Sequence, residues 1–435
     1  MVESWIPSAS VRLLKRVSAA SESPPTGRSV QRRTARNIVD PNEHSITGVH
    51  FDWLIGSVTL KPGPLHYVLN SGLLIMSETI LSDSLASAAT GRHENTTRSK
   101  PISGLHYDWI INLLSAIFVG GLYLDGWAHN HGRVDESFFT PWHAFFYSGY
   151  LLVAVAFVVA AVANRARGFP LSLSIPDGYR LTGVGLFVFA AGGVGDMVWH
   201  ILFGIERGIE ALFSPTHLLL GLGIGLTVTG PLRAAWNRKD AGSSWRELGP
   251  AIASLATFLA ALTFFMMFFF PVTVLLGTAG TGSGYFRNDV GKVAGMVGAT
   301  LTAAALAGPT LLALRRWRLP LGAVSIVLWI SILGATIVDY DRPLMVWLAL
   351  GMAVPALAVD YLAWRARPSA NPNAVRWLAP AIPLLLYGGY YLVLLPTAGS
   401  TWSVHMWTST IVIPAMVCWL LSFLLVPPQL PETHS

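Results

Sequence analysis

Long apolar runs alternate with short polar connections from residue 108 onward. About 20 apolar residues are enough for a helix to cross a bilayer, and the runs are continuous rather than alternating in polarity, which argues against a membrane β-barrel. The pattern predicts an all-α, polytopic membrane bundle of about ten transmembrane helices. The predicted spans are 108–130, 142–163, 180–203, 215–236, 248–276, 291–314, 319–338, 343–364, 376–395 and 402–426.

The first part of the chain, residues 1–105, is rich in Ser, Thr, Arg and Pro and contains no run long enough to span. Its first 40 residues are basic and poor in acids, as in a transit peptide. A disordered cytoplasmic tail or an overextended gene start is the preferred interpretation, and a transit peptide is the alternative. The sequence thus predicts three parts: this polar region, a four-helix half at 106–236 and a six-helix half of unknown role at 237–435.

Positive charge is distributed unevenly between the two sets of connections. The loops after the second, fourth, sixth and eighth spans hold Arg165, Arg167, Arg180, Arg233, Arg238, Lys239, Arg246, Arg315, Arg316, Arg318, Arg365, Arg367 and Arg376. The opposite loops hold Arg133, Arg207, Arg287, Lys292 and Arg342. Because cytoplasmic loops carry the excess of Lys and Arg, we expect both termini to be cytoplasmic, in the cell (inner) membrane. The net charge of +6 then reflects topology, and no nucleic-acid partner is required.

Composition narrows the chemistry. The chain is 53% hydrophobic and 12% charged, and Cys418 is its single cysteine. Disulfides, iron–sulfur clusters and thiolate zinc sites are therefore excluded within one chain. A bound metal would have to be held by imidazole and carboxylate groups, which suit copper(II), zinc and iron(II).

A polar motif occurs twice in the four-helix half. In each copy an Asp stands four residues before a His at the end of an apolar run, and a Ser/Thr-Pro-x-His opens the next run. The six candidate metal ligands are Asp125, His129 and His143 in the first copy and Asp196, His200 and His217 in the second. Ionisable groups are costly in a membrane, and an Asp-His-His set is typical of metal sites.

Helix geometry predicts that each set converges. Residues four apart share a helix face, so each Asp projects beside its first His. Thr140 and Ser214 fit the N-cap position, and Pro141 and Pro215 fit the first position of the following helix. A short hairpin would then return the third ligand beside the first two. The alternative is structural: the aspartates hydrogen-bond the imidazoles and lock the hairpins without a metal.

Other polar residues are weaker candidates. His131 lies beside the first motif, and Glu206 and Glu210 lie in the loop of the second. A glutamate there could supply a further ligand or a proton relay, although a solvated loop acid is the simpler interpretation.

The first motif, Asp125-Gly-Trp-Ala-His129, continues through Phe139-Thr-Pro-Trp-His143 to an aromatic pair ending at Tyr147. This stretch resembles the copper-binding segment of the C-type membrane component of particulate methane and ammonia monooxygenases, which are copper-containing membrane enzymes. The resemblance implies copper at Asp125, His129 and His143. The second motif is similar in order to a further cluster of that family, with Asp196 where the family has Asn.

The resemblance implies a copper-dependent membrane monooxygenase or its copper-bearing subunit, acting on a small apolar substrate beside other membrane subunits or in a homo-oligomer. Two alternatives remain open. The same residues could serve an intramembrane zinc hydrolase, in which a metal-activated water attacks a lipid ester or amide. They could also serve a non-catalytic copper-binding or assembly protein.

Overall fold

The computed structural model describes residues 101–133, 139–204, 208–239, 242–279, 284–338 and 342–428, all within one compact unit that extends from Ser99 to Ser435. These residues form helices and no strand, apart from one isolated bridge between Thr278 and Ser400. The predicted all-α fold is confirmed. The predictions for residues 1–100 lie outside the described part of the chain.

Eight described helices are long and apolar enough to cross a membrane: α3 (Leu105–Asn130), α4 (Pro141–Ala166), α6 (Arg180–Phe203), α10 (Trp245–Phe265), α11 (Asp289–Arg316), α13 (Pro343–Ala366), α14 (Ala374–Thr397) and α15 (Val404–Leu425). Helices α8 (Pro215–Val228) and α9 (Gly230–Asn237) pass the same test together and are bent by 40°. Helix α12 (Ala323–Ile337) is shorter. The short elements are α5 (Leu171–Ser174), α7 (Glu210–Phe213) and η2 (Gly284–Arg287). The chain is therefore a membrane protein.

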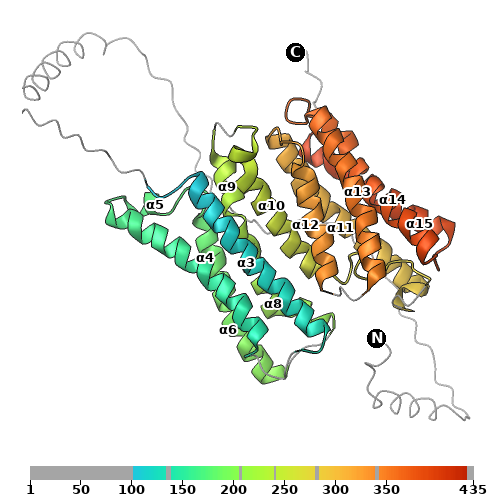
Figure 1. Cartoon of the computed structure of the whole chain (residues 1–435), viewed down its shortest axis with the longest axis horizontal. Coiled ribbons are helices and arrows are strands. Elements are labelled where there is room, and N and C mark those ends of the chain that lie inside the picture. Colours follow the sequence, from blue (N-terminus) through green and yellow to red (C-terminus); the bar gives the residue numbers. More distant parts are fainter. Residues whose placement is uncertain are drawn as a thin grey trace, which may run out of the picture. The chain divides into compact units, whose positions relative to one another are not determined.

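The helices form two groups joined by α10 (Figure 1). In the first group α3 packs on α4 and α6 packs on α8, so each pair is an antiparallel hairpin. In the second group α13 and α14 pack together, with α12 against α13 and α15 against α14 and α11. Helix α10 contacts α3, α8 and α9 on one side and α11 and α12 on the other. It is the element that connects the two groups.

Glycines allow close approach within the hairpins. A Cβ added at Gly121 of α3 would stand 2.8 Å from the Cα of Phe146 on α4, and one at Gly149 of α4 would stand 2.6 Å from the Cα of Phe118. In the second hairpin, a Cβ added at Gly223 of α8 would stand 2.7 Å from the backbone nitrogen of Phe189 on α6. Small residues at these positions let the backbones touch, as is common between membrane helices.

The predicted fifth span, 248–276, is wrong at its end. Helix α10 stops at Phe265, and residues 266–279 form a series of turns although much of this segment is buried. Pro271 lacks a backbone N–H and disfavours continuation of the helix. The Tyr390 hydroxyl donates to the carbonyls of Pro271 at 3.1 Å and Leu276 at 3.0 Å. Irregular backbone is tolerated at this depth because the protein satisfies such groups internally.

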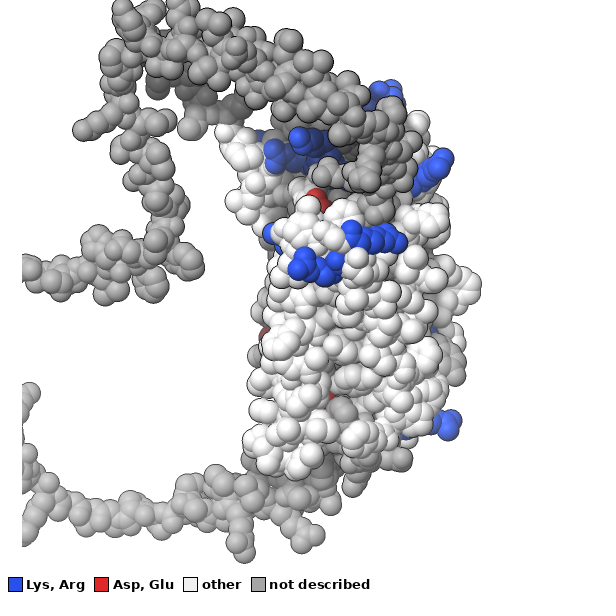
Figure 2. Space-filling model, turned by 90° about the vertical axis from the view of Figure 1, so that its left-hand side faces the viewer, with Lys and Arg blue, Asp and Glu red and all other residues white. Residues whose placement is uncertain are grey.

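One end of the helices is basic. The last turns of α4, α11 and α13 carry arginines, and Figure 2 shows Lys and Arg side chains gathered toward one end of the face in view, with a broad uncharged band beyond them. At this end Asp108 of α3 is buried, accepts a hydrogen bond from Tyr179 at 2.7 Å and pairs with Arg238 at 2.8 Å. The beginnings of α3 and α6 and the end of α9 are thereby tied together.

Candidate metal centres

The first Asp-His-His group lies where α3 ends and α4 begins, at the end of the helices opposite the basic one. Asp125 and His129 occupy the last turns of α3, and His143 the first turn of α4. The side chain of Thr140 caps α4 and accepts the backbone N–H of His143 at 3.1 Å, with Pro141 next to it, as predicted. Asp125 Oδ2 lies 3.7 Å from His129 Nε2 and 3.4 Å from His143 Nε2.

The second group repeats this arrangement on α6 and α8. Asp196 and His200 lie on α6, and His217 lies in the first turn of α8, which Ser214 caps. Asp196 Oδ2 is 3.3 Å from His200 Nε2, and Asp196 Oδ1 is 3.6 Å from His217 Nδ1. The structure thus brings all six predicted ligands into two triads, the Asp125 triad (Asp125, His129, His143) and the Asp196 triad (Asp196, His200, His217).

The spacing of the ligand atoms fits a shared ion. In each triad, one potential ligand atom per residue can be chosen so that all three lie within 4.8 Å of one another. Two atoms bound to one ion at about 2.1 Å can stand no farther apart than about 4.2 Å. The four Asp–His distances already satisfy this limit. Small side-chain movements would bring the remaining pairs within it.

The charge balance favours a cation in each triad. Among the described residues, the charged partners of Asp125 and Asp196 are histidines and not Lys or Arg, so an imidazolium or a metal ion there would balance the carboxylate charge. The two imidazole rings of each triad are 5.9 Å apart, and protonating both would place like charges side by side. Asp125 Oδ1 is also buried without a hydrogen-bond partner in the described part of the chain. A metal ion would resolve both conflicts.

The two triads are neighbours, and Tyr147 lies near both. His129 interacts electrostatically with His200 and His217 of the other triad. Tyr147, one turn after His143 on α4, interacts electrostatically with Asp125 and with Asp196.

Packing explains how Tyr147 reaches this position. Its ring lies against Gly193 of α6, where an added Cβ would be 2.9 Å from the Tyr147 Cε1 atom, and its centroid is 5.6 Å from that of Phe189. Sequence reasoning did not assign Tyr147 to the site. The available signal was its spacing of four residues from His143 together with the glycine three residues before Asp196.

Two hydroxyl groups contact the Asp196 triad, and neither contact was predicted from the sequence. Thr216 Oγ1 donates to Asp196 Oδ1 at 2.8 Å, and Ser214 Oγ lies 2.6 Å from His217 Nδ1. The signal for Thr216 was its place between Pro215 and His217, on the capping turn itself. The Thr216 contact orients the carboxylate, whereas Ser214 approaches the same His217 nitrogen that faces Asp196.

The weaker candidates do not join the triads. His131 stacks on Trp127 with ring centroids 4.9 Å apart, and its Nδ1 is 2.8 Å from the Trp127 carbonyl oxygen. Glu210 is exposed at the start of α7. Glu206 lies outside the described residues.

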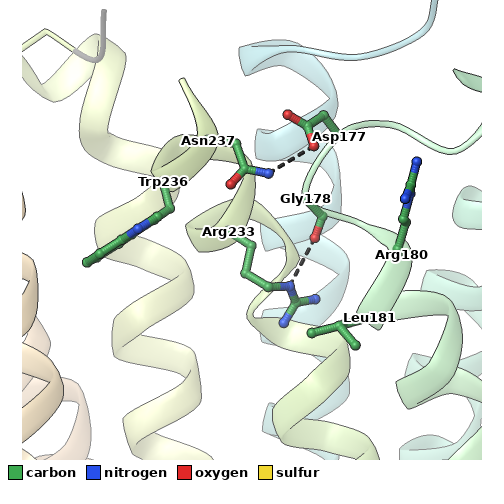
Figure 3. Close-up of a pocket in the computed structure, with 7 residues that line it drawn as sticks. All are labelled: Asp177, Gly178, Arg180, Leu181, Arg233, Trp236 and Asn237. Atoms are coloured by element: carbon green, nitrogen blue, oxygen red, sulfur yellow. Dashed lines mark hydrogen bonds between the residues drawn. The ribbon is translucent and has the colours of Figure 1, made fainter. Parts of the chain in front are cut away.

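A separate shallow pocket of about 420 Å³ lies at the basic end and is lined by Asp177, Gly178, Arg180, Leu181, Arg233, Trp236 and Asn237 (Figure 3). Its polar groups are engaged with one another: Arg233 donates to the Gly178 carbonyl at 2.9 Å, and Asn237 to Asp177 at 2.9 Å. Arg233 also donates to Thr182. The hydrogen bonds in this pocket connect α9 to the residues just before α6, and the pocket shares no residue with either triad.

The fold and site together define a helical membrane protein with two adjacent groups of one carboxylate and two imidazoles. Comparison of the chain with protein-family models, with curated proteins and with solved structures finds no match.

Proposed function

We propose that this protein binds copper at its Asp125 and Asp196 triads and is a monooxygenase-like membrane oxidoreductase, or the copper-bearing subunit of one. The observation that carries the proposal is that the structure contains two complete Asp-His-His sets, in each of which three potential ligand atoms lie within 4.8 Å of one another. Imidazole and carboxylate ligands suit copper(II) and zinc alike, and the resemblance of the first motif to the particulate monooxygenases favours copper.

The membrane setting supports the same function. We infer ten crossings, counting the bent pair α8 and α9 as one and including α12, with both termini on the cytoplasmic side of the cell membrane. The basic ends of α4, α11 and α13 support this orientation. His143 opens α4 and Arg165 closes it, so the triads would face the outer side.

The protein's own residues would hold and orient the ion, and three protein ligands leave positions open for other molecules. Bound copper would supply one-electron chemistry with oxygen. A site at the edge of the bilayer suits a small apolar substrate that dissolves in lipid. The electrons would have to come from an external donor, and the further subunits would be other membrane proteins or additional copies of this chain.

The test is the metal content of the full chain as purified from cells supplied with both copper and zinc, measured by mass spectrometry, because copper(II) outcompetes zinc at most such sites in a direct competition. We expect copper in both triads of the wild-type protein, and loss of one equivalent in each of His143→Ala and His217→Ala. His405→Ala is the matched control because His405 is an exposed histidine outside both triads and should leave the copper content unchanged.

The outcomes separate the alternatives. Equal copper in all four proteins would contradict metal binding at the triads. Zinc retained in preference to copper would indicate the intramembrane hydrolase instead. Copper bound at both triads without oxygen-dependent turnover, in the presence of an electron donor and small alkanes or ammonia, would indicate a non-catalytic copper-binding or assembly protein.

A further inference from the structure

The two triads share a ligand set but differ in how the carboxylate is held. In the Asp196 triad, Oδ1 of the aspartate accepts a hydrogen bond from Thr216 at 2.8 Å, while Oδ2 faces His200 at 3.3 Å. In the Asp125 triad, Oδ2 faces both histidines, and Oδ1 is buried with no hydrogen-bond partner in the described residues. One carboxylate is fixed through both oxygens, and the other keeps one oxygen available.

Exposure differs in the same direction at the first histidine and the aspartate of each triad, and in the opposite direction at the second histidine, which is 15% exposed for His143 and 23% for His217. The side chain of His129 is 37% exposed, whereas that of His200, its counterpart, is 10% exposed. The side chain of Asp125 is 13% exposed, and that of Asp196 is 3% exposed. A molecule arriving at the Asp125 triad therefore meets the most exposed of the four histidines, His129, and the more exposed of the two aspartates.

The difference originates at one position of the duplicated capping turn. Between proline and histidine, the second copy has Thr216, whose hydroxyl reaches Asp196. The first copy has Trp142, whose indole N–H donates to the carbonyl of Arg133 at 3.0 Å. The hydroxyl that supports the aspartate is thus present in the second copy, as Thr216, and absent at the equivalent position of the first copy, which is Trp142.

Supporting hydrogen bonds raise metal affinity because they fix the ligands in the binding geometry, and buried sites exchange slowly. Closed sites are typical of structural metals, whereas reactive sites keep an open position. We propose that the Asp125 triad is the exchangeable site, at which an external small ligand meets the metal, and that the Asp196 triad retains its metal. This inference rests on the proposed function.

The first test uses the copper(II)-loaded full chain and two probes, azide as the external ligand and EDTA as the chelator. In electron paramagnetic resonance spectra, the Asp125 triad gives the component that is absent from His143→Ala, and the Asp196 triad gives the component that is absent from His217→Ala. Azide should change the first component and leave the second unchanged. EDTA should remove copper in two phases with rates at least about tenfold apart. The fast phase should be missing in His143→Ala and the slow phase in His217→Ala.

Two outcomes are decisive against the inference. Azide acting equally on both components, or on the Asp196 component alone, overturns it while leaving copper binding and the proposed function intact. If no copper binds to either triad, the proposed function fails and the inference fails with it.

The second test changes only the supporting hydroxyl. Thr216→Val removes the hydrogen bond to Asp196 while all six ligands remain, and Thr216→Ser is the matched control that keeps a hydroxyl at this position. We expect Thr216→Val to accelerate the slow EDTA phase about tenfold or more and Thr216→Ser to leave it near the wild-type rate. An unchanged slow phase in Thr216→Val contradicts the role of this residue.

A third measurement needs no metal. Diethyl pyrocarbonate modifies accessible neutral imidazoles, and peptide mass spectrometry of the metal-free protein gives a rate for each histidine. We expect His129 to react several-fold faster than His200, in accord with their exposed fractions of 37% and 10%. Equal rates would show that the two triads are equally accessible and would overturn the inference.

Discussion

Substitution of a single glycine should separate the ligands of one triad without touching any of them. Gly121 lies one turn before Asp125 on α3, and Phe146 lies three residues after His143 on α4. A Cβ at Gly121 would stand 2.8 Å from the Cα of Phe146. At the adjacent Gly120, an added Cβ meets nothing within 4 Å, so Gly120→Ala is the matched control for Gly121→Ala.

The magnitude follows from the shortfall in distance. Ordinary contact begins at 3.4 Å, so restoring it in Gly121→Ala requires α3 and α4 to move apart by about 0.6 Å, because a backbone atom cannot rotate away. Overpacking of this kind costs about 1–3 kcal/mol, against a helix-propensity gain of about 1 kcal/mol. We expect a net loss of up to about 2 kcal/mol for Gly121→Ala and a gain of up to about 1 kcal/mol for Gly120→Ala.

The same movement should reach the Asp125 triad. Asp125 Oδ2 and His143 Nε2 are 3.4 Å apart, and a 0.6 Å displacement along that direction approaches the limit of about 4.2 Å for two ligands of one ion. We expect copper affinity at this triad to fall about 10- to 100-fold in Gly121→Ala, the loss typical of a missing support. The Asp196 triad lies on α6 and α8 and should keep its affinity.

Two assays check these expectations. Unfolding in mixed detergent micelles with increasing dodecyl sulfate gives the change in stability, and copper titration followed by electron paramagnetic resonance gives the affinity of each triad. Equal stability of the two alanine variants would refute the packing argument. Reduced stability of Gly121→Ala with unchanged affinity at the Asp125 triad would show that the hairpin does not set the ligand distance.

Three further predictions concern the framework. Asp108→Asn removes the charge that pairs with Arg238, and should lower the free energy of unfolding in detergent by about 1–3 kcal/mol; wild-type stability would contradict a supporting role. Burial and the neighbouring Asp108 raise the pKa of Tyr179, so its stabilising contribution is full below the unfolded-state pKa of about 10 and is lost as pH rises above that value. Tyr179→Phe should therefore weaken alkaline destabilisation, and an unchanged pH profile would argue against it. Asp360 accepts two backbone N–H groups at the start of α12, at 2.6 and 2.8 Å, so Asp360→Ala should cost about 1–2 kcal/mol and Asp360→Asn less, as unfolding curves would show.

Hydropathy was sufficient to locate the helices because every residue of a membrane helix satisfies its backbone internally and the apolar length is then the main constraint. The predicted span 180–203 coincides with α6, for example. The error at the end of α10 has a specific cause. Residues 266–276 are as apolar as a helix, but Pro271 and the hydroxyl of Tyr390, far away in the sequence, favour an irregular path. The number of crossings stays a prediction, since α12 and the bent pair α8 and α9 are marginal by length.

The grouping of the six residues into two triads was predictable because its geometry is local. Asp125 and His129 share a helix face by spacing alone, and the Thr140 cap places His143 at the start of the next helix. Tyr147 was not predictable to the same degree. Its position near both triads depends on how α4 meets α6 across Gly193, which is a tertiary contact that spacing within one helix does not encode.

The difference between Trp142 and Thr216 shows why a duplicated motif need not have a duplicated role. Both copies keep the acid, the two imidazoles and the capping proline, so their ligand chemistry is equivalent. The residue between proline and histidine is not a ligand in either copy. In the second copy the Thr216 hydroxyl donates to Asp196, whereas in the first copy the Trp142 indole donates to Arg133, and one oxygen of Asp125 has no hydrogen-bond partner among the described residues. Because metal affinity and exchange depend on such supporting contacts as well as on the ligands, one difference in a capping turn would be enough to separate a retained ion from an exchangeable one. Under the proposed function, the distinction between the two hairpins would therefore lie in the capping turns, beside the ligands.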